Sequence, residues 1–107
     1  MARFITQHSE YTGFAKSGTG IRTMHFYAAV QTSDEDFALG ITISKRVGKA
    51  HARNLLKRRI KSFIRLRGNT LPRGFKINLI ARSGAAELGW IQLREELDGL
   101  LARLDTR

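Results

Sequence analysis

Cysteine is absent from this 107-residue chain, which excludes disulfides, thiolate nucleophiles and cysteine-ligated zinc. No apolar run approaches the roughly 18 residues that are needed to span a bilayer. The N-terminal residues MARFITQHSEY lack the apolar core of a signal peptide. We therefore expect a cytoplasmic protein with no membrane partner.

Acidic residues are missing from the middle of the chain, where no Asp or Glu occurs between Asp36 and Glu87. The formal net charge is +10, and the hydrophobic content of 42% is that of a folded protein rather than a basic tail. Excess positive charge on a folded domain is typical of nucleic-acid binding, because each neutralised phosphate releases counterions. We expect one domain, residues 1–107, that binds a polyanion.

Catalytic constellations are also missing, so we expect no catalytic residue, no protein-bound metal and no small-molecule substrate. The histidines lie in separate predicted elements without metal-ligand spacing: His8, His25 and His51. No serine has the context of a nucleophile elbow, and no glycine-rich loop has Walker spacing. The carboxylates at 34–36 and 95–96 are expected in a turn and on a solvated helix face, although the turn could touch hydrated magnesium near an RNA.

Positive charge is concentrated in residues 43–67, which contain ten basic residues and no acidic one: Lys45, Arg46, Lys49, Arg53, Lys57, Arg58, Arg59, Lys61, Arg65 and Arg67. Strong helix formers from Lys49 onward, followed by Gly68 and Asn69, predict a helix over residues 49–67. At 100° per residue the segment divides into two sides. The apolar side is expected to hold Ala52, Leu55, Leu56, Ile60, Phe63 and Leu66, with Arg59 inside that arc and Ile64 inside the basic one.

Two other interpretations of this helix are a solvated surface helix and a helix lying on an anionic membrane. Solvated helices usually alternate acidic and basic residues, whereas this helix repeats like charges four residues apart, at a cost in stability. Expected strands on both sides would bury its apolar face inside a domain. Both features favour a polyanionic partner.

The remaining elements give the order α-β-β-α-β-α, an α+β layer sandwich. They are a helix from Thr6 to about Ser17, strands at 25–31, 37–43 and 75–81, and a helix over about 86–104 with a leucine repeat expected in the core. The polar residues 32–36 predict an antiparallel hairpin between the first two strands. The strand–helix–strand sequence that follows predicts a parallel pairing or a return across the sheet.

Five aromatic residues lie between positions 11 and 37: Tyr11, Phe14, Phe26, Tyr27 and Phe37. Phe26 and Phe37 are expected to fill the core. Tyr11 and Tyr27 have polar tips, and aromatic rings beside a basic surface can stack unpaired bases. Whether these two tyrosines face a wet groove or the core is open at this stage.

In this order of elements, the segment Ser44–Ala50 followed by Arg53-Asn54 and Lys57-Arg58 resembles the protein subunit of bacterial ribonuclease P. The resemblance extends to Glu10-Tyr11 with Gly18, to residues 75–82, and to Leu93 with the leucines after it. One departure is Leu55, where the family's Arg-Asn-Arg signature has its third residue. Arg59, one turn later, is a candidate to supply that guanidinium. Ala15 and Ala29 also stand where the family often has aromatics.

The resemblance implies a ribosomal-protein-S5-like α/β two-layer sandwich with a left-handed β-α-β crossover. It implies a protein that accompanies a catalytic RNA, which removes the 5′ leader of precursor tRNA with Mg²⁺ bound mainly through RNA. The implied RNA-binding residues are Lys45, Arg46, Lys49, Arg53, Asn54, Lys57, Arg58, Arg59, Lys61 and Arg65. The implied leader groove holds Tyr11, Phe14 and Tyr27. The alternative is a general ribosomal or RNA-chaperone module without a nuclease role.

Overall fold

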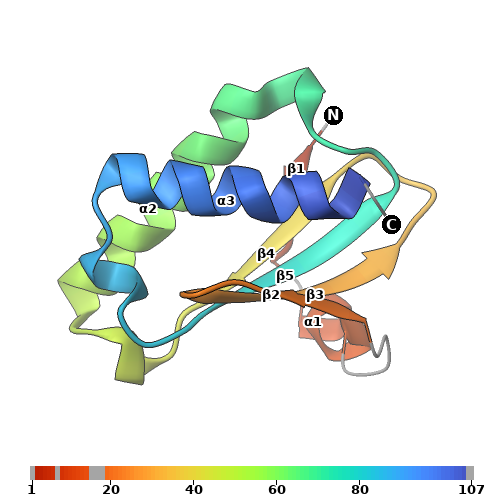
Figure 1. The fold of residues 1–107 in the computed structure, drawn as a ribbon. Coiled ribbons are helices and arrows are strands. Elements are labelled where there is room, and N and C mark those ends of the chain that lie inside the picture. Colours follow the sequence, from red (N-terminus) through yellow and green to blue (C-terminus); the bar gives the residue numbers. More distant parts are fainter. Residues whose placement is uncertain (1, 7, 15–18, 106–107) are drawn as a thin grey trace.

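A five-stranded sheet and three helices make up the computed structural model, which describes residues 2–6, 8–14 and 19–105 (Figure 1). The strands are β1 (Arg3–Phe4), β2 (Gly20–Arg22), β3 (Phe26–Thr32), β4 (Ala38–Thr42) and β5 (Phe75–Ala81). The helices are α1 (His8–Gly13), α2 (Ala50–Arg67) and α3 (Trp90–Asp105). Short 3-10 turns cover Lys45–Val47, Gly68–Thr70 and Ala85–Glu87.

The strands are ordered β1-β4-β5-β3-β2, with β5 at the centre of the sheet. The predicted hairpin between the strands at 25–31 and 37–43 is therefore wrong, because β5 lies between β3 and β4. The 32–36 connection instead passes around the start of β5, where Ser33 N donates to Gly74 O and Gly74 N donates to Glu35 O. Three consecutive residues of β5 are buried, from Ile77 to Leu79, as expected of a strand that has a paired neighbour on each side.

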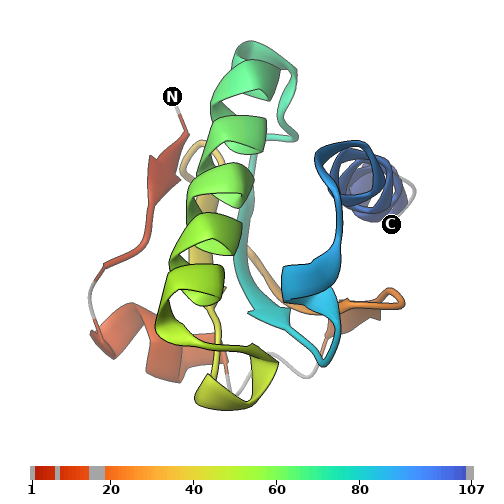
Figure 2. The ribbon, with the colours of Figure 1, turned by 90° about the vertical axis from the view of Figure 1, so that its left-hand side faces the viewer.

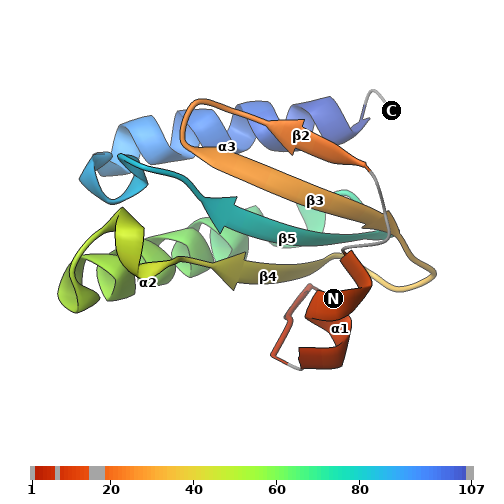
Figure 3. The same cartoon turned by 90° about the horizontal axis from the view of Figure 1, so that it is seen from below.

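The chain passes from β4 to β5 through α2, and these two neighbouring strands are parallel. Figure 3 shows both strands running toward the left, with β5 above β4 and α2 behind the sheet, which makes the crossover left-handed. Right-handed crossovers are the norm for such units. The implied left-handed route is thus present, and the predicted α/β fold class is confirmed.

The two faces of the sheet are covered unequally (Figures 1 and 2). Helices α2 and α3 cover one face and enclose the larger core, which includes Phe26, Phe63 and Ile77. The predicted leucine core of α3 is confirmed, since its buried residues are Leu93, Leu97, Leu100 and Leu104. Among the described residues, only the short α1 lies on the opposite face, and they leave much of that face uncovered (Figure 3).

Several predicted boundaries and helix faces need correction. The last helix was expected from about residue 86 but begins at Trp90, after the separate turn Ala85–Glu87. Strands β1 and β2 were not predicted, because they carry too few residues to show an alternating pattern. The predicted first helix reached Ser17, but residues 15–18 lie outside those that the structure describes. On α2, Ile64 is buried, whereas Leu55 and Leu66 are exposed, so the apolar arc is turned toward Ile64. None of the helices in the described ranges is both long and apolar enough to cross a membrane.

Candidate nucleic-acid interface

The outer face of α2, with the 3-10 turn before it, presents most of the predicted RNA-binding side chains to solvent. The exposed ones are Lys45, Arg46, Lys49, Asn54, Lys57, Arg58 and Arg65, and the half-buried ones are Arg53, Arg59 and Lys61. We call these ten residues the basic face. They form one surface because the 45–47 turn leads into α2 and the cations recur three and four residues apart along it.

In the part of the chain that the structure describes, no ion pair joins a carboxylate to the basic face. Across residues 2–6, 8–14 and 19–105, ion pairs link the carboxylates to cations elsewhere: Glu10 and Glu35 to Arg3 and Lys76, Asp36 to Arg73, Glu96 to His25, and Asp98 to Arg67. The uncompensated cations repel one another along the helix. Phosphate groups of a partner would relieve that repulsion.

Arg53 of the basic face is hydrogen-bonded to the backbone of the segment that precedes α2. Its Nε donates a hydrogen bond of 3.1 Å to the carbonyl oxygen of Gly48. The side chain thereby connects the first turn of α2 to the loop that carries Arg46 and Lys49. This contact leaves the two terminal nitrogens of the guanidinium for a partner, at a fixed position.

At the other end of α2, β1 places the ring of Phe4 against the basic face. Lys61 Nζ lies 5.2 Å and Arg65 Cζ 5.6 Å from the centroid of that ring. The electron-rich ring attracts both cations and offsets part of their mutual repulsion. Sequence reasoning missed Phe4, because a two-residue strand gives no alternation that could have signalled its place.

Arg59 lies on the flank of α2 that faces α3. Its Nη1 donates a hydrogen bond of 3.2 Å to Leu88 O in the segment before α3. One nitrogen of the guanidinium thus fixes the approach of that segment to α2. Leu55, one turn earlier, is 38% exposed and reaches no core position. That Arg59 replaces the missing signature arginine stays a prediction.

A second candidate surface lies on the uncovered face of the sheet, opposite α2. The strand registers align the side chains of β2, β3, β5 and β4 in one transverse row of four residues: Arg22, Tyr27, Ile80 and Thr42. We call these four residues the sheet row. None of the four is buried, so the row combines aromatic, apolar and polar surface with one cation. Beside it, Thr42 Oγ1 donates to Asn78 Oδ1 at 2.8 Å.

The three predicted leader-groove aromatics lie on this face in different environments. Tyr27 is half-buried, and its ring lies so close to Gly20 that a Cβ there would come within 2.1 Å of the hydroxyl oxygen. Tyr11 lies over Gly40, donates to Ile5 O at 3.1 Å and accepts from Ile41 N at 3.2 Å. Phe14 is only 5% exposed and packs under α1, so its ring offers no free face to a base.

A cluster of four charged residues holds α1 on the sheet. Arg3 donates to Glu10 Oε1 and Oε2 at 3.1 and 2.7 Å, and Lys76 Nζ lies 3.2 Å from Glu10. The hydrogen bonds from Arg3 are the largest cause that lowers the pKa of Glu10, to about 2. They also lower the pKa of Glu35, which completes the cluster. The cluster fixes one wall of the uncovered face.

His25 and the acidic residues at 34–36 and 95–96 lie in surroundings that do not resemble a metal site. Nowhere in the described ranges do three or more His, Asp or Glu side chains gather as a metal site would require. His25 Nδ1 lies 2.8 Å from Glu96 Oε1, in a contact between the β2–β3 turn and α3. Asp36 pairs with Arg73. These contacts are structural ties between elements.

Fold and surfaces together indicate the class of small α/β proteins that bind nucleic acid. A sequence model of the family described as "Ribonuclease P" matches residues 2–105. The ribonuclease P protein component of Desulforapulum autotrophicum is 36% identical over 94% of this chain and 86% of its own. That of Geotalea uraniireducens is 34% identical over 94% and 88%.

Solved structures agree with these sequence relatives. The ribonuclease P protein from Thermotoga maritima has a TM-score of 0.84 and 28% identity, covering 92% of this chain and 94% of its own. The Staphylococcus aureus protein has a TM-score of 0.85, with 94% of each chain covered, and at 24% identity it supports the fold alone. The chain therefore belongs to the ribonuclease P protein family, and the predicted function as a ribonuclease P protein subunit is confirmed.

Proposed function

We propose that this subunit assists a catalytic RNA in cutting the 5′ leader from precursor tRNA, with the RNA carrying the chemistry. Family membership makes an RNA subunit the partner. The observation that carries the proposal is the basic face, whose cations have no carboxylate partner among the described residues. A surface of this kind binds RNA phosphates in proportion to the charges that it neutralises.

The basic face is the proposed contact with the catalytic RNA. Arg53, fixed by its bond to Gly48 O, would present a guanidinium in a constant orientation, which suits bidentate binding of phosphate. The exposed lysines Lys45, Lys49 and Lys57 would act as point charges on mobile stems. Asn54 adds a neutral donor and acceptor among the cations.

The sheet row is the proposed contact with the unpaired leader. Tyr27 offers a partly exposed ring for stacking, and Arg22, Thr42 and Asn78 surround it with polar groups that suit phosphate, sugar and base edges. Tyr11 would border the groove from α1. Phe14 would act from beneath, by holding α1 in place.

Mg²⁺ is the proposed cofactor, bound mainly through the RNA. Mg²⁺ prefers oxygen ligands and keeps several waters, and phosphates would supply most of those oxygens. The protein's contribution would be positive charge that allows the RNA to fold and bind substrate at lower Mg²⁺ concentrations. We further propose that the subunit works in the cytoplasm, where the absence of cysteine makes it indifferent to redox state.

The test is cleavage of a precursor tRNA by a bacterial ribonuclease P RNA at low Mg²⁺, with and without this protein. Stimulation that is greater for a substrate with a long 5′ leader than for one with a single leader nucleotide would support both proposed surfaces. Tight RNA binding without stimulation would favour a general RNA-binding module instead. Stimulation that does not depend on leader length would refute leader binding by the sheet row, but not RNA binding by the basic face.

A further inference from the structure

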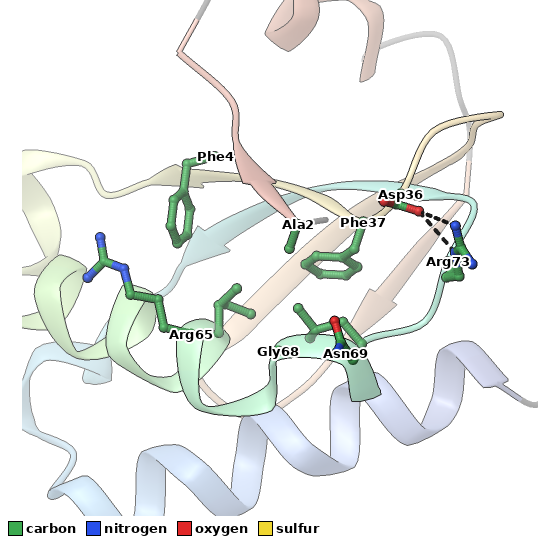
Figure 4. Close-up of a pocket in the computed structure, with 10 residues that line it drawn as sticks. Ala2, Phe4, Asp36, Phe37, Arg65, Gly68, Asn69 and Arg73 are labelled. Atoms are coloured by element: carbon green, nitrogen blue, oxygen red, sulfur yellow. Dashed lines mark hydrogen bonds and ion pairs between the residues drawn. The ribbon is translucent and has the colours of Figure 1, made fainter.

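A cleft of about 450 Å³ lies between β1 and the C-terminal end of α2, away from the sheet row (Figure 4). Its floor is apolar and consists of Phe37, Ile64 and Leu71, each of which is 6% exposed or less. The ring of Phe4 forms one wall, and Figure 4 shows Phe4 and Phe37 projecting into the same space. The volume is in the range of small-ligand sites.

The rim of this cleft is cationic. Arg65 lies on one side and, together with Lys61, contacts the ring of Phe4. Arg73 lies across the cleft and is paired with Asp36 at 2.8 Å. The charged residues that line the cleft are thus two arginines, Arg65 and Arg73, and one carboxylate, Asp36. The exposed side chain of Asn69 lines the cleft at the end of α2 and supplies an amide that both donates and accepts.

We propose that this cleft binds one unpaired nucleotide of the partner RNA. The base would enter the cleft and pack on Phe4 and Leu71, while Asn69 contacts its polar edge. The flanking phosphates would lie on Arg65 and Lys61. The inference rests on the proposed function, because it takes the RNA subunit as the source of the nucleotide.

The position and charge of the cleft favour an RNA strand as its occupant. Lys61 and Arg65 belong to the basic face, so phosphates bound along α2 lead directly to the mouth of the cleft. An apolar peptide would bury these cations without a counter-charge, which is unfavourable. A nucleotide suits both the floor and the rim of the cleft, because its base can pack on the apolar floor and its phosphate can bind the cations of the rim.

The direct test is a titration of the protein with adenosine 5′-monophosphate, followed by amide chemical shifts. We expect saturable shifts at residues 2–4 and 65–73 at roughly millimolar nucleotide, as for a single stacked base with one charge contact. Adenosine and inorganic phosphate, titrated separately, should each shift these residues far less. Shifts that phosphate alone reproduces, or equal binding of adenosine, would overturn the proposal.

The second test fills the cleft without removing a charge. Ala2 lines the cleft, and Ala2→Trp should abolish the nucleotide shifts and weaken binding of the ribonuclease P RNA by roughly tenfold, about the worth of one stacked base. The matched control is Ala102→Trp, at an exposed position of α3, which should bind within about twofold of wild type. Asn69→Ala, in an exposed turn, provides a second variant if Ala2→Trp disturbs the fold.

The outcomes separate the two levels of the proposal. If wild-type protein neither binds nor stimulates the RNA, the proposed function itself fails. If wild type binds and stimulates but Ala2→Trp and Asn69→Ala behave like it, only the nucleotide cleft is refuted.

Discussion

At the scale of residues, the uncovered face of the sheet depends on two positions where side chains are small. Gly40 leaves room for the ring of Tyr11, whose nearest ring carbon would lie 2.6 Å from a Cβ at this position. Gly20 leaves similar room for Tyr27. Each tyrosine is therefore positioned by a glycine on a neighbouring segment, and the orientation of its ring depends on that glycine as well as on the tyrosine itself.

Gly40→Ala is expected to displace Tyr11 and break its hydrogen bonds to Ile5 and Ile41. Disruption of these bonds and of the ring packing should lower the free energy of unfolding by roughly 1 to 3 kcal/mol. Urea denaturation measures the change. The control is Gly99→Ala, in the middle of α3, where a Cβ meets nothing within 4 Å and greater helix propensity should stabilise the protein slightly. A Gly40→Ala protein as stable as wild type would show that Tyr11 moves aside at no cost.

Sequence reasoning identified part of this face and missed the rest for a definite reason. Tyr27 was predicted because an aromatic residue with a polar tip is conspicuous in a strand. Arg22, Thr42 and Ile80 were missed, because they become its neighbours only through the pairing of four strands. The predicted hairpin would have placed β4 beside β3 and produced a different row.

At the scale of elements, α1 has few residues and depends on charged contacts for its position. Tyr11 of α1 and Phe14, just after α1, pack in the small core beneath this helix, whereas Glu10 binds Arg3 of β1 and Lys76 of β5. Helices as short as this one are marginal by themselves. The position of α1, and with it one wall of the uncovered face, should therefore follow the ionisation of Glu10.

Glu10→Gln is expected to reduce stability at neutral pH and to flatten the acid side of the stability profile. The folded-state pKa of Glu10 lies near 2, below its ordinary value of 4.5. The ionised Glu10 carboxylate therefore makes its full contribution to the free energy of unfolding above pH 4.5, and this contribution is lost as the pH falls toward 2. The difference in unfolding free energy between wild type and variant, measured from pH 7 to 2, should shrink over that range. A difference that does not vary with pH would mean that the carboxylate charge is not what holds α1.

The elements that could be predicted are those whose pattern is complete within one segment. Residues 75–81 match β5, and the expected helix at 49–67 matches α2 within one residue. The strand order could not be predicted, because polar residues between two strands are compatible with a tight hairpin or with a path around a third strand. Here β5 occupies the gap, where it pairs with β3 on one side and with β4 on the other.

At the scale of the molecule, the two proposed RNA contacts lie on opposite sides of one sheet. The basic face is on the layer formed by α2 and α3, and the sheet row is on the opposite face of the sheet, which is also the face where α1 lies (Figures 1 and 3). One small domain could thus hold a large RNA on one side and an unpaired strand on the other. The phosphate contacts of the two sides should contribute separately to the dependence of binding on salt.

Lys57→Ala and Arg58→Ala are expected to weaken binding of the ribonuclease P RNA and to reduce its salt dependence. Both side chains are exposed on α2, and the removal of one phosphate-binding cation should lower the slope of log K against log salt by roughly 0.7 to 0.9. The double variant should lower it about twice as much, because each bound phosphate releases its own counterions. Filter binding at several salt concentrations gives the slopes.

The control for this prediction is Arg94→Ala, which removes the same charge from α3. Arg94 is exposed, and its guanidinium lies 5.8 Å from the ring centroid of Trp90, outside the basic face. Its removal should leave the slope nearly unchanged if RNA contacts are confined to the basic face. Equal slopes for Lys57→Ala, Arg58→Ala and Arg94→Ala would instead mean that RNA binding depends on total charge. The proposal that the RNA contacts the basic face of α2 would then be wrong.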